Sequence, residues 1–266
     1  MGSSRPLAAR WLKSGAPDLS ATLINRSRAK FDPASYESAA YSGLGGKFAS
    51  NLELSDILKC PAIALSVLEI GVGTGRVFEK LASRSGYAVG IDRDPKMARH
   101  VAQRMRQSDG LKPSNIELIV ADGEHLPFRR AAFEQVVCIR VLRYFEEPQK
   151  AIHGMSEVLK SGGWLVAEFA NVLRPHTILQ VPGYLAKGEF YPRLFSRRKI
   201  SEWITGQGFE VHQLIGWHKI PVEILSNASN PAVLRILLGF ETALQKLSPP
   251  EFMSRSLFLS ALKIDS

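Results

Sequence analysis

Short apolar runs and segments of helical spacing follow one another along most of the chain. From residue 66 onward we expect seven strands, each rich in Val, Ile, Leu or Phe, over 66–72, 87–92, 116–120, 133–141, 164–169, 209–215 and 257–264. Apolar residues repeat at helical spacing between most of them, which predicts helices after Thr74 and over 94–105, 149–159, 196–206 and 231–247. Strands that alternate with helices are typical of a mostly parallel sheet covered by helices on both faces.

The segments outside this alternating unit have a looser pattern. Residues 1–65 precede it and are expected to be mostly helical, with breaks at Pro33 and at the glycines between 43 and 46. Two irregular insertions, near 172–195 and 218–256, follow the fifth and sixth expected strands. We therefore expect an N-terminal helical extension over 1–65 and one α/β domain over 66–266.

A glycine-rich turn directly follows the first expected strand, where residues 69–76 read EIGVGTGR. Glycine has no Cβ atom and tolerates unusual dihedral angles, so such a turn lets a ligand approach the backbone closely. A dinucleotide-binding turn has the spacing G-x-G-x-x-G, but the third glycine of that motif is replaced by Arg76 here. The turn instead has the spacing G-x-G-x-G and follows an acidic residue, Glu69.

Acidic residues also stand at the ends of the next two expected strands. Asp92 ends the second strand, and Asp122 and Gly123 follow the third. The carboxyl ends of parallel strands meet at one edge of a doubly wound sheet, where ligands bind. Each carboxylate alone can be explained as a turn former, but their order along the chain predicts one shared binding site.

Taken in order, these residues resemble the motifs of the class I S-adenosylmethionine-dependent methyltransferases. The family pattern acidic-x-G-x-G-x-G is matched at residues 69–75, and Asp92 and Asp122 stand where the family contacts the ribose and the adenine. The segments 133–145 and 158–163 are similar to the family's fourth strand and to the entry of its fifth, so the resemblance covers about residues 66–170. It implies a Rossmann-like doubly wound, mostly parallel seven-stranded sheet with an N-terminal helical lid, and S-adenosylmethionine as the cofactor.

The resemblance also implies which residues hold that cofactor. Glu69 would face the amino group of the methionyl part, Asp92 both ribose hydroxyls, and Asp122 the adenine amino group. The residues after the fourth strand would contribute mostly backbone contacts. The expected cofactor-binding residues are Glu69, Gly71, Gly73, Gly75, Asp92, Arg93, Asp122, Gly123, Ile139 and Arg140.

The sequence defines the acceptor side less well. Many family members have a histidine after the fourth strand, where this chain has Arg143 followed by Tyr144. Arginine stays protonated and cannot act as a base, so we expect Arg143 and Tyr144 to bind substrate. His176 is the first candidate for a catalytic base and Glu168 the second, and the alternative for His176 is a loop residue without a catalytic task.

Aromatic and apolar residues near the expected pocket indicate the kind of acceptor. Tyr36 and Tyr41 in the N-terminal extension are similar to the lid of family members that act on small molecules, and an aromatic face there would suit the sulfonium cation. Simple packing explains the two tyrosines equally well. The Leu, Ile, Phe and Trp content of the insertions favours a small hydrophobic acceptor, and O-, N- and C-methylation remain open.

Two alternative functions remain open, and the net charge bears on the first. The 266 residues carry a formal net charge of +9, which suits an RNA or protein methyltransferase. The basic residues are dispersed and form no stripe interleaved with aromatics, so a nucleic-acid partner is not expected. A non-catalytic protein that retains the S-adenosylmethionine pocket is the other alternative. Monomer and homodimer both fit the composition.

Short signals bear on location and metal content. Cys60 and Cys138 lie in apolar surroundings, as is typical of reduced thiols in a cytoplasmic protein. Arg5, Arg10 and Lys13 precede the first acidic residue, so a mitochondrial targeting segment is the alternative. No apolar run reaches the roughly eighteen residues that a membrane span needs. The histidines show no metal-ligand spacing, and no metal is expected.

Overall fold

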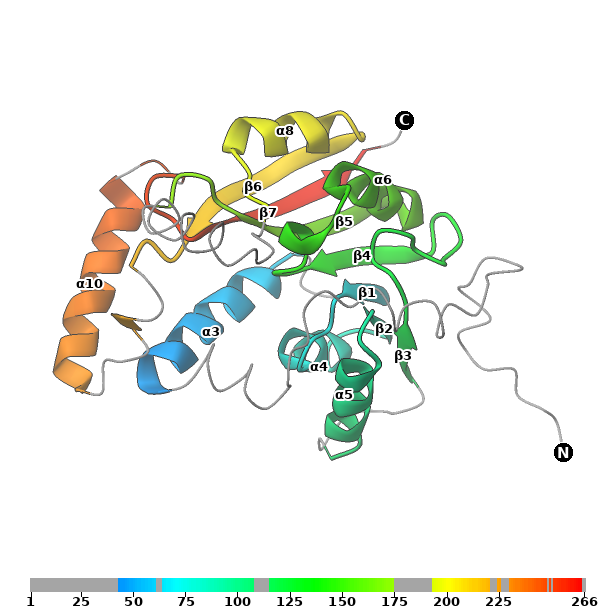
Figure 1. Cartoon of the computed structure of the whole chain (residues 1–266), viewed down its shortest axis with the longest axis horizontal. Helices are drawn as coiled ribbons and strands as arrows, with labels where there is room; N and C mark the ends of the chain where they lie inside the picture. The colour runs from blue at the N-terminus through cyan, green and yellow to red at the C-terminus, as the bar shows by residue number, and fades with distance from the viewer. Residues whose placement is uncertain are drawn as a thin grey trace, which may run out of the picture.

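A seven-stranded sheet forms the centre of the computed structural model, which describes residues 43–60, 64–107, 115–174, 193–220, 224–225, 230–247, 249 and 251–264 (Figure 1). The strands are β1 (Ser66–Ile70), β2 (Tyr87–Asp92), β3 (Ile116–Val120), β4 (Phe133–Cys138), β5 (Leu159–Ala170), β6 (Phe209–Trp217) and β7 (Ser256–Lys263). Their order is β3-β2-β1-β4-β5-β7-β6, and only the pairs made by β7 are antiparallel. The expected Rossmann-like, mostly parallel seven-stranded sheet is confirmed.

The strand order creates a crevice at the carboxyl ends of β1 and β4. The chain leaves β1 toward β2 on one side and later returns to β4 on the other side. Connections that diverge in this way leave a space beyond the strand ends, which is where ligands bind in open α/β sheets.

Helices cover both faces of the sheet (Figure 1). One face packs against α3 (Gly43–Ile57), α4 (Arg76–Ala82) and α5 (Pro95–Gln107). The other face packs against the short 3-10 helix η4 (Leu142–Tyr144), α6 (Pro148–Val158) and α8 (Arg197–Thr205). Because side chains alternate along a strand, Val67 of β1 enters the first layer and Leu68 the second. A further helix, α10 (Pro231–Leu247), stands at one end of the sheet and packs on a small separate cluster that contains Leu225.

β1, β6 and β7 differ slightly from the expected ranges, since β1 ends at Ile70, β6 ends at Trp217 and β7 covers Ser256–Lys263. Two strand boundaries differ more. β4 ends at Cys138 rather than at 141, because Arg140 has a left-handed backbone with φ of 65° and the chain turns there into η4. β5 begins at Leu159 rather than at 164, since residues 161–163 stay within the strand instead of forming a separate turn. The pairing of β4 with β5 shifts register in this region, between Phe133 and Gln135.

The segments outside the sheet are described only in part. Residues 43–57 of the N-terminal extension form a helix, whereas residues 1–42 lie outside the described residues. The lid role of the extension and the domain boundary at residue 65 stay predictions. The expected insertions also fall partly on residues that the structure does not describe, including 175–192.

Candidate functional site

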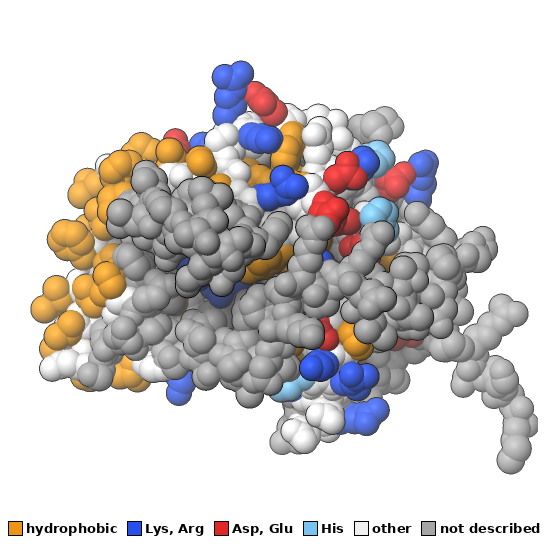
Figure 2. All heavy atoms as spheres, viewed as in Figure 1, with side chains coloured by type: hydrophobic (Ala, Val, Ile, Leu, Met, Phe, Trp, Pro, Cys, Tyr) orange, Lys and Arg blue, Asp and Glu red, His pale blue; other side chains and the backbone are white. Residues whose placement is uncertain are grey.

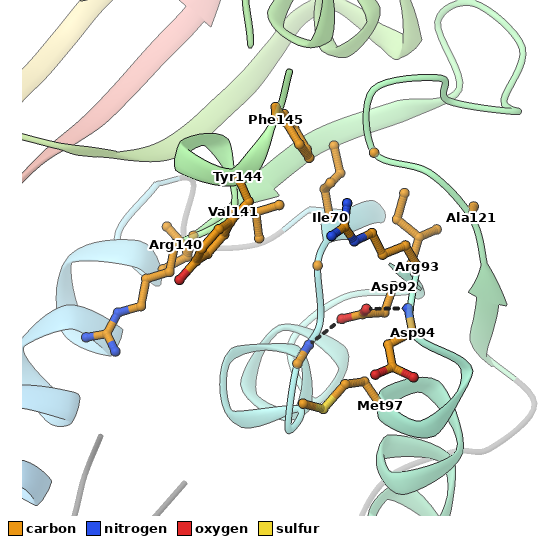
Figure 3. Close-up of a pocket in the computed structure, with 15 residues that line it drawn as sticks. Ile70, Asp92, Arg93, Asp94, Met97, Ala121, Arg140, Val141, Tyr144 and Phe145 are labelled. Atoms are coloured by element: carbon orange, nitrogen blue, oxygen red, sulfur yellow. Dashed lines mark hydrogen bonds between the residues drawn. The ribbon is translucent and has the colours of Figure 1, made fainter. Parts of the chain in front are cut away.

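A cavity opens at the carboxyl ends of the central strands, at the crevice between β1 and β4 (Figure 3). The structure brings many of the predicted site residues into its lining, namely Gly71, Gly73, Asp92, Arg93, Gly123, Ile139, Arg140 and Tyr144. The lining also contains Ile91 and residues that the sequence does not single out as site residues, namely Ile70, Asp94, Met97, Ala121, Val141 and Phe145. The strand ends of β1 to β4 therefore share one pocket.

The glycines form the floor of this cavity on the side of β1. Gly71 and Gly73 have left-handed backbones, with φ of 74° and 52°. A Cβ atom added at Gly71 would collide with the side chain of Val141, whereas one added at Gly73 would meet no described atom within 4 Å. The missing side chain of Gly71 thus lets Val141, in the turn after β4, pack closely against the backbone. The missing side chain of Gly73 leaves space for a ligand. Gly75, with φ of 85°, precedes α4 and lies outside the lining.

Asp92 is held firmly at the end of β2. Its Oδ2 accepts a hydrogen bond from the backbone N–H of Gly73 at 3.0 Å, and its Oδ1 accepts one from the backbone N–H of Asp94 at 2.9 Å (Figure 3). Burial raises the pKa of Asp92, and the two backbone hydrogen bonds oppose this shift. The carboxylate is therefore fixed in position and still has lone pairs for donors on a ligand.

Glu69 provides a second carboxylate beneath the same turn. It is buried, and its Oε2 has no hydrogen-bond partner among the described residues. Burial raises the pKa of Glu69 well above its ordinary value, against the opposing charge of Arg76, and the negative charge of Asp92 raises it further. A buried carboxylate that lacks a partner is costly for the protein alone. Such a group can be satisfied by a cationic part of a ligand.

Asp122 is engaged with its own turn after β3. Its Oδ1 accepts a hydrogen bond from the backbone N–H of Glu124 at 3.0 Å, and its Oδ2 lies 3.2 Å from Nδ1 of His125. Its neighbours Ala121 and Gly123 line the cavity, while Asp122 itself does not. In this structure Asp122 shapes the loop after β3 whose residues Ala121 and Gly123 line the cavity.

Glu168, near the end of β5, accepts hydrogen bonds at both carboxylate oxygens. Its Oε2 accepts from the backbone N–H of Arg140 at 2.9 Å, and its Oε1 accepts from Nη2 of Arg143 at 2.7 Å. The Nε atom of Arg143 is buried and has no hydrogen-bond partner among the described residues. Glu168 therefore fixes the turn after β4, which carries Tyr144 into the lining.

A third buried carboxylate, that of Glu53 on α3, lies behind the cavity. Its Oε2 accepts from Nη2 of Arg76 at 2.7 Å, and its Oε1 lies 2.9 Å from Nε2 of His218 and also accepts from Nη2 of Arg140. Figure 3 shows the guanidinium of Arg140 turned away from Asp92, toward α3. Burial raises the pKa of Glu53, but Arg140, His218 and Arg76 together hold it well below its ordinary value.

Sequence reasoning missed this cluster and part of the lining. Met97 could have been found, because it repeats with Val101 and Met105 at every fourth position on the inward side of α5. Arg76 carried a weaker signal, since a charged residue directly after the last glycine of a buried turn needs a partner. No local pattern points to Glu53.

Three predicted site residues lie outside the described residues, namely Tyr36, Tyr41 and His176. Their roles stay predictions. Within the described ranges, no group of three or more His, Cys, Asp or Glu side chains could hold a metal ion. Among the helices that the structure describes, none is long and apolar enough to cross a membrane.

Comparison with known proteins adds to this geometry. A family model described as a methyltransferase domain matches residues 68–167, the stretch from β1 to β5 that carries the strand ends around the cavity. This stretch of the chain thus carries a methyltransferase-domain match, within the region that resembles the class I S-adenosylmethionine-dependent methyltransferases. This result bears out the resemblance seen in the sequence.

Two curated relatives align with parts of the chain. The ubiquinone/menaquinone biosynthesis C-methyltransferase UbiE of Wigglesworthia glossinidia brevipalpis is 32% identical over 111 residues, 40% of this chain and 44% of that protein. The ubiquinone biosynthesis O-methyltransferase of Coxiella burnetii is 23% identical over 169 residues, 59% of this chain and 68% of that protein. The chain thus spans less than half the length of the UbiE relative.

A solved structure matches the chain over most of its length. The N-methyltransferase NodS from Bradyrhizobium japonicum, in complex with S-adenosyl-l-homocysteine, superposes with a TM-score of 0.58. The match covers 93% of this chain and 100% of NodS at 16% sequence identity. At this identity the likeness shows a shared fold alone.

Proposed function

We propose that the chain binds S-adenosylmethionine in the cavity and transfers its methyl group to a small, hydrophobic acceptor. The observation that carries the proposal is the buried Glu69 carboxylate, whose Oε2 lacks a partner among the described residues beneath the glycine turn. S-adenosylmethionine brings a positively charged amino group that would satisfy this oxygen. A dinucleotide would bring phosphates, which the carboxylates of Glu69 and Asp92 repel.

The other residues of the pocket fit the remaining parts of this cofactor. Asp92 is held by two backbone N–H groups, so its free lone pairs can accept from both ribose hydroxyls in a fixed direction. Ala121, Gly123, Met97 and Phe145, which line the cavity, would hold the adenine. Such mostly apolar linings with a few placed polar groups are common in cofactor sites.

The protein contributes alignment rather than covalent chemistry. S-adenosylmethionine, when bound, supplies a methyl group activated by its sulfonium. The chain must hold an acceptor atom in line with that group and exclude water. Val141 and Tyr144 line the cavity and would form its wall toward the acceptor. Because Glu168 already accepts hydrogen bonds from Arg140 and Arg143, we assign it a positioning role, and His176 remains the candidate base for an acceptor that must lose a proton.

The names of the two relatives suggest the acceptor class. Both relatives are named for quinone biosynthesis, one as a C-methyltransferase and the other as an O-methyltransferase. Together with the apolar lining, these names favour a ring-bearing, lipid-like acceptor for this chain. They do not agree on the atom that receives the methyl group, so the proposal leaves that atom open.

Two measurements on the full chain test the proposal. Calorimetry should show binding of S-adenosylhomocysteine and none of NAD⁺. Label from methyl-labelled S-adenosylmethionine should then appear in alkyl-substituted hydroquinones and phenols rather than in bulk RNA or protein. Binding of NAD⁺ alone would refute the cofactor assignment. Label found only in RNA or protein would favour the macromolecular alternative, and cofactor binding without transfer to any acceptor would favour a non-catalytic protein.

A further inference from the structure

Large hydrophobic side chains gather on the outward face of α10, at one end of the molecule (Figure 2). Val233, Ile236, Phe240 and Leu247 are 47%, 72%, 64% and 84% exposed. They follow one another at intervals of three, four and seven residues, which places them on one stripe of the helix. The opposite side of α10 is also apolar, because its leucines pack on the cluster of Leu225.

Charge on α10 is distributed unevenly between these two sides. Its acidic residue, Glu241, is buried and accepts hydrogen bonds from the backbone N–H groups of Lys219 and Ile220 at 3.0 and 2.7 Å. Its basic residues, Arg235 and Lys246, are both exposed. The exposed surface of α10 therefore combines an apolar stripe with positive charge. The carboxylate of Glu241 is bound in the interior by backbone N–H groups and does not offset this charge.

We propose that this face of α10 docks onto the surface of an anionic lipid bilayer. Helices that lie at a membrane surface bury Phe and Leu side chains at the boundary of the headgroups, while Lys and Arg attract anionic lipids. The net charge of +9 strengthens this attraction. An anionic bilayer thus accounts for both the exposed stripe and the sign of the charge beside it.

A second copy of the chain complements this face less well. In an antiparallel pair of α10 helices centred on Phe240, Arg235 of one copy would approach Lys246 of the other. In a parallel pair, each cation would meet its own counterpart. Neither arrangement supplies a carboxylate from α10, because Glu241 is turned inward.

The N-terminal residues 1–42 also complement the exposed face of α10 poorly, because their charge repels it. They contain six lysines and arginines against three acidic residues, so their net charge has the same sign as that of the outward face. Docking on a bilayer does not rest on the proposed reaction, although a bilayer would bring a lipid-like acceptor close to the protein.

Co-sedimentation of the full chain with vesicles tests this inference. We expect binding to vesicles of phosphatidylcholine with phosphatidylglycerol, weaker binding to phosphatidylcholine alone, and a decrease as salt is added. The double variant Ile236→Asp/Phe240→Asp should lower binding at least about tenfold, because it places two charges in the apolar stripe. Arg235→Glu/Lys246→Glu should lower binding about tenfold on the anionic vesicles only.

Leu65→Asp is the matched control for the apolar variant. Leu65 is 69% exposed but lies just before β1, at the amino-terminal end of the sheet, so this variant should bind vesicles as the wild type does. Thermal unfolding and calorimetry with S-adenosylhomocysteine should give the same values for all variants. These two readouts separate a failure of docking from a failure of the proposed methyl transfer.

Three results would overturn the inference. The first is a wild-type chain that does not bind anionic vesicles. The second is vesicle binding that the α10 variants leave unchanged, which would assign the lipid contact to another segment such as the basic N-terminus. The third is a dimer, measured by light scattering, that Ile236→Asp/Phe240→Asp dissociates while no vesicle binding is seen, which would assign the face to a second copy.

Discussion

Glu53 on α3 and Glu69 on β1 are both buried, exposing 1% and 3% of their surface. Burial raises the pKa of both side chains, yet the pKa of Glu53 lies well below its ordinary value and that of Glu69 well above it. Their partners account for the difference. Glu53 has hydrogen bonds to Arg76, Arg140 and His218, whereas Oε2 of Glu69 has no partner among the described residues.

Arg76 connects the two carboxylates. Arg76 pairs with Glu53 at 2.7 Å. Its positive charge also lowers the pKa of Glu69 through electrostatic attraction. Arg76 and Arg140 thus pair with Glu53, which connects α3 to the sheet edge. Under the proposed function, Glu69 would instead pair with a cationic group of the ligand, so burial alone would not distinguish a structural carboxylate from a binding one.

Removal of Glu53 is expected to have the largest effect on the fold. Glu53→Ala should lower the free energy of unfolding by about 3 to 5 kcal/mol, because it removes the buried carboxylate that pairs with both Arg76 and Arg140. Urea unfolding at neutral pH measures this change. The control Glu79→Ala removes the partly exposed partner of Arg104 and should cost no more than about 1 kcal/mol.

The pH dependence of the same variant gives an independent check. Since the pKa of Glu53 is lowered in the folded state, its contribution to stability is complete above the ordinary pKa of glutamate and is lost as the pH falls through the lowered value. Glu53→Ala should therefore lose less stability than the wild type on acidification below that ordinary pKa. Equal stability of the two proteins at neutral pH would show that the cluster is not a structural tie.

Among the pocket variants, Asp92→Ala should cause the largest loss of ligand affinity. The affinity for S-adenosylhomocysteine, measured by calorimetry, should fall about 100-fold or more, because hydrogen bonds to a charged group are each worth about 1.5 to 3 kcal/mol. The fold should remain, as judged by circular dichroism. Glu210→Ala makes the same change of charge at an exposed position of β6 and should leave the affinity unchanged. An Asp92→Ala protein with wild-type affinity would remove Asp92 from the site.

Glu69→Gln should change stability and binding in opposite directions. Without ligand, the variant should be about 1 kcal/mol more stable than the wild type at pH values above the raised pKa of Glu69, because a buried charge without a partner for Oε2 is replaced by a neutral amide. Its affinity for S-adenosylhomocysteine should fall about tenfold, since the charged acceptor for the ligand's amino group is lost. Unfolding and calorimetry of the same samples test both statements.

The sign of the pH effect at Glu69 is opposite to that at Glu53. Because the pKa of Glu69 is raised in the folded state, the folded protein holds the proton between the ordinary and the raised value, and stability falls as the pH rises through that window. Glu69→Gln should remove this loss. A variant that is less stable than the wild type and binds the ligand equally well would make Glu69 a structural residue like Glu53.

The same two glutamates show what could be predicted from the sequence. Glu69 and the lining residues Gly71 and Asp92 lie at the ends of neighbouring strands, so their order along the chain is enough to place them at one edge of the sheet. The partners of Glu53 lie 23, 87 and 165 residues away from it, and only the strand order brings them together. Sequence reasoning therefore found the pocket and missed the cluster behind it.

The boundaries of the strands also fall into two groups, those set by the local sequence and those set by tertiary contacts. The bounds of β2 and β3 follow from apolar runs that end at a turn, and they were predicted to the residue. The apolar run of β4 continues to Val141, but the chain leaves the sheet at Cys138. The left-handed backbone of Arg140, whose N–H is bound by Glu168 and whose guanidinium is bound by Glu53, sets that end. Such tertiary contacts override the local pattern.

The smallest effect is expected for an ion pair of the same length on the surface. Arg130 and Glu157 approach to 2.6 Å, close to the 2.7 Å of Arg76 and Glu53, but the side chain of Arg130 is 82% exposed. Water already solvates both groups, so Arg130→Ala should change the free energy of unfolding by no more than about 0.5 kcal/mol. Urea unfolding beside Glu53→Ala measures the contrast directly. If both substitutions cost the same, distance rather than burial would set the strength of these pairs, and the distinction between Glu53 and Glu69 would lose its physical basis.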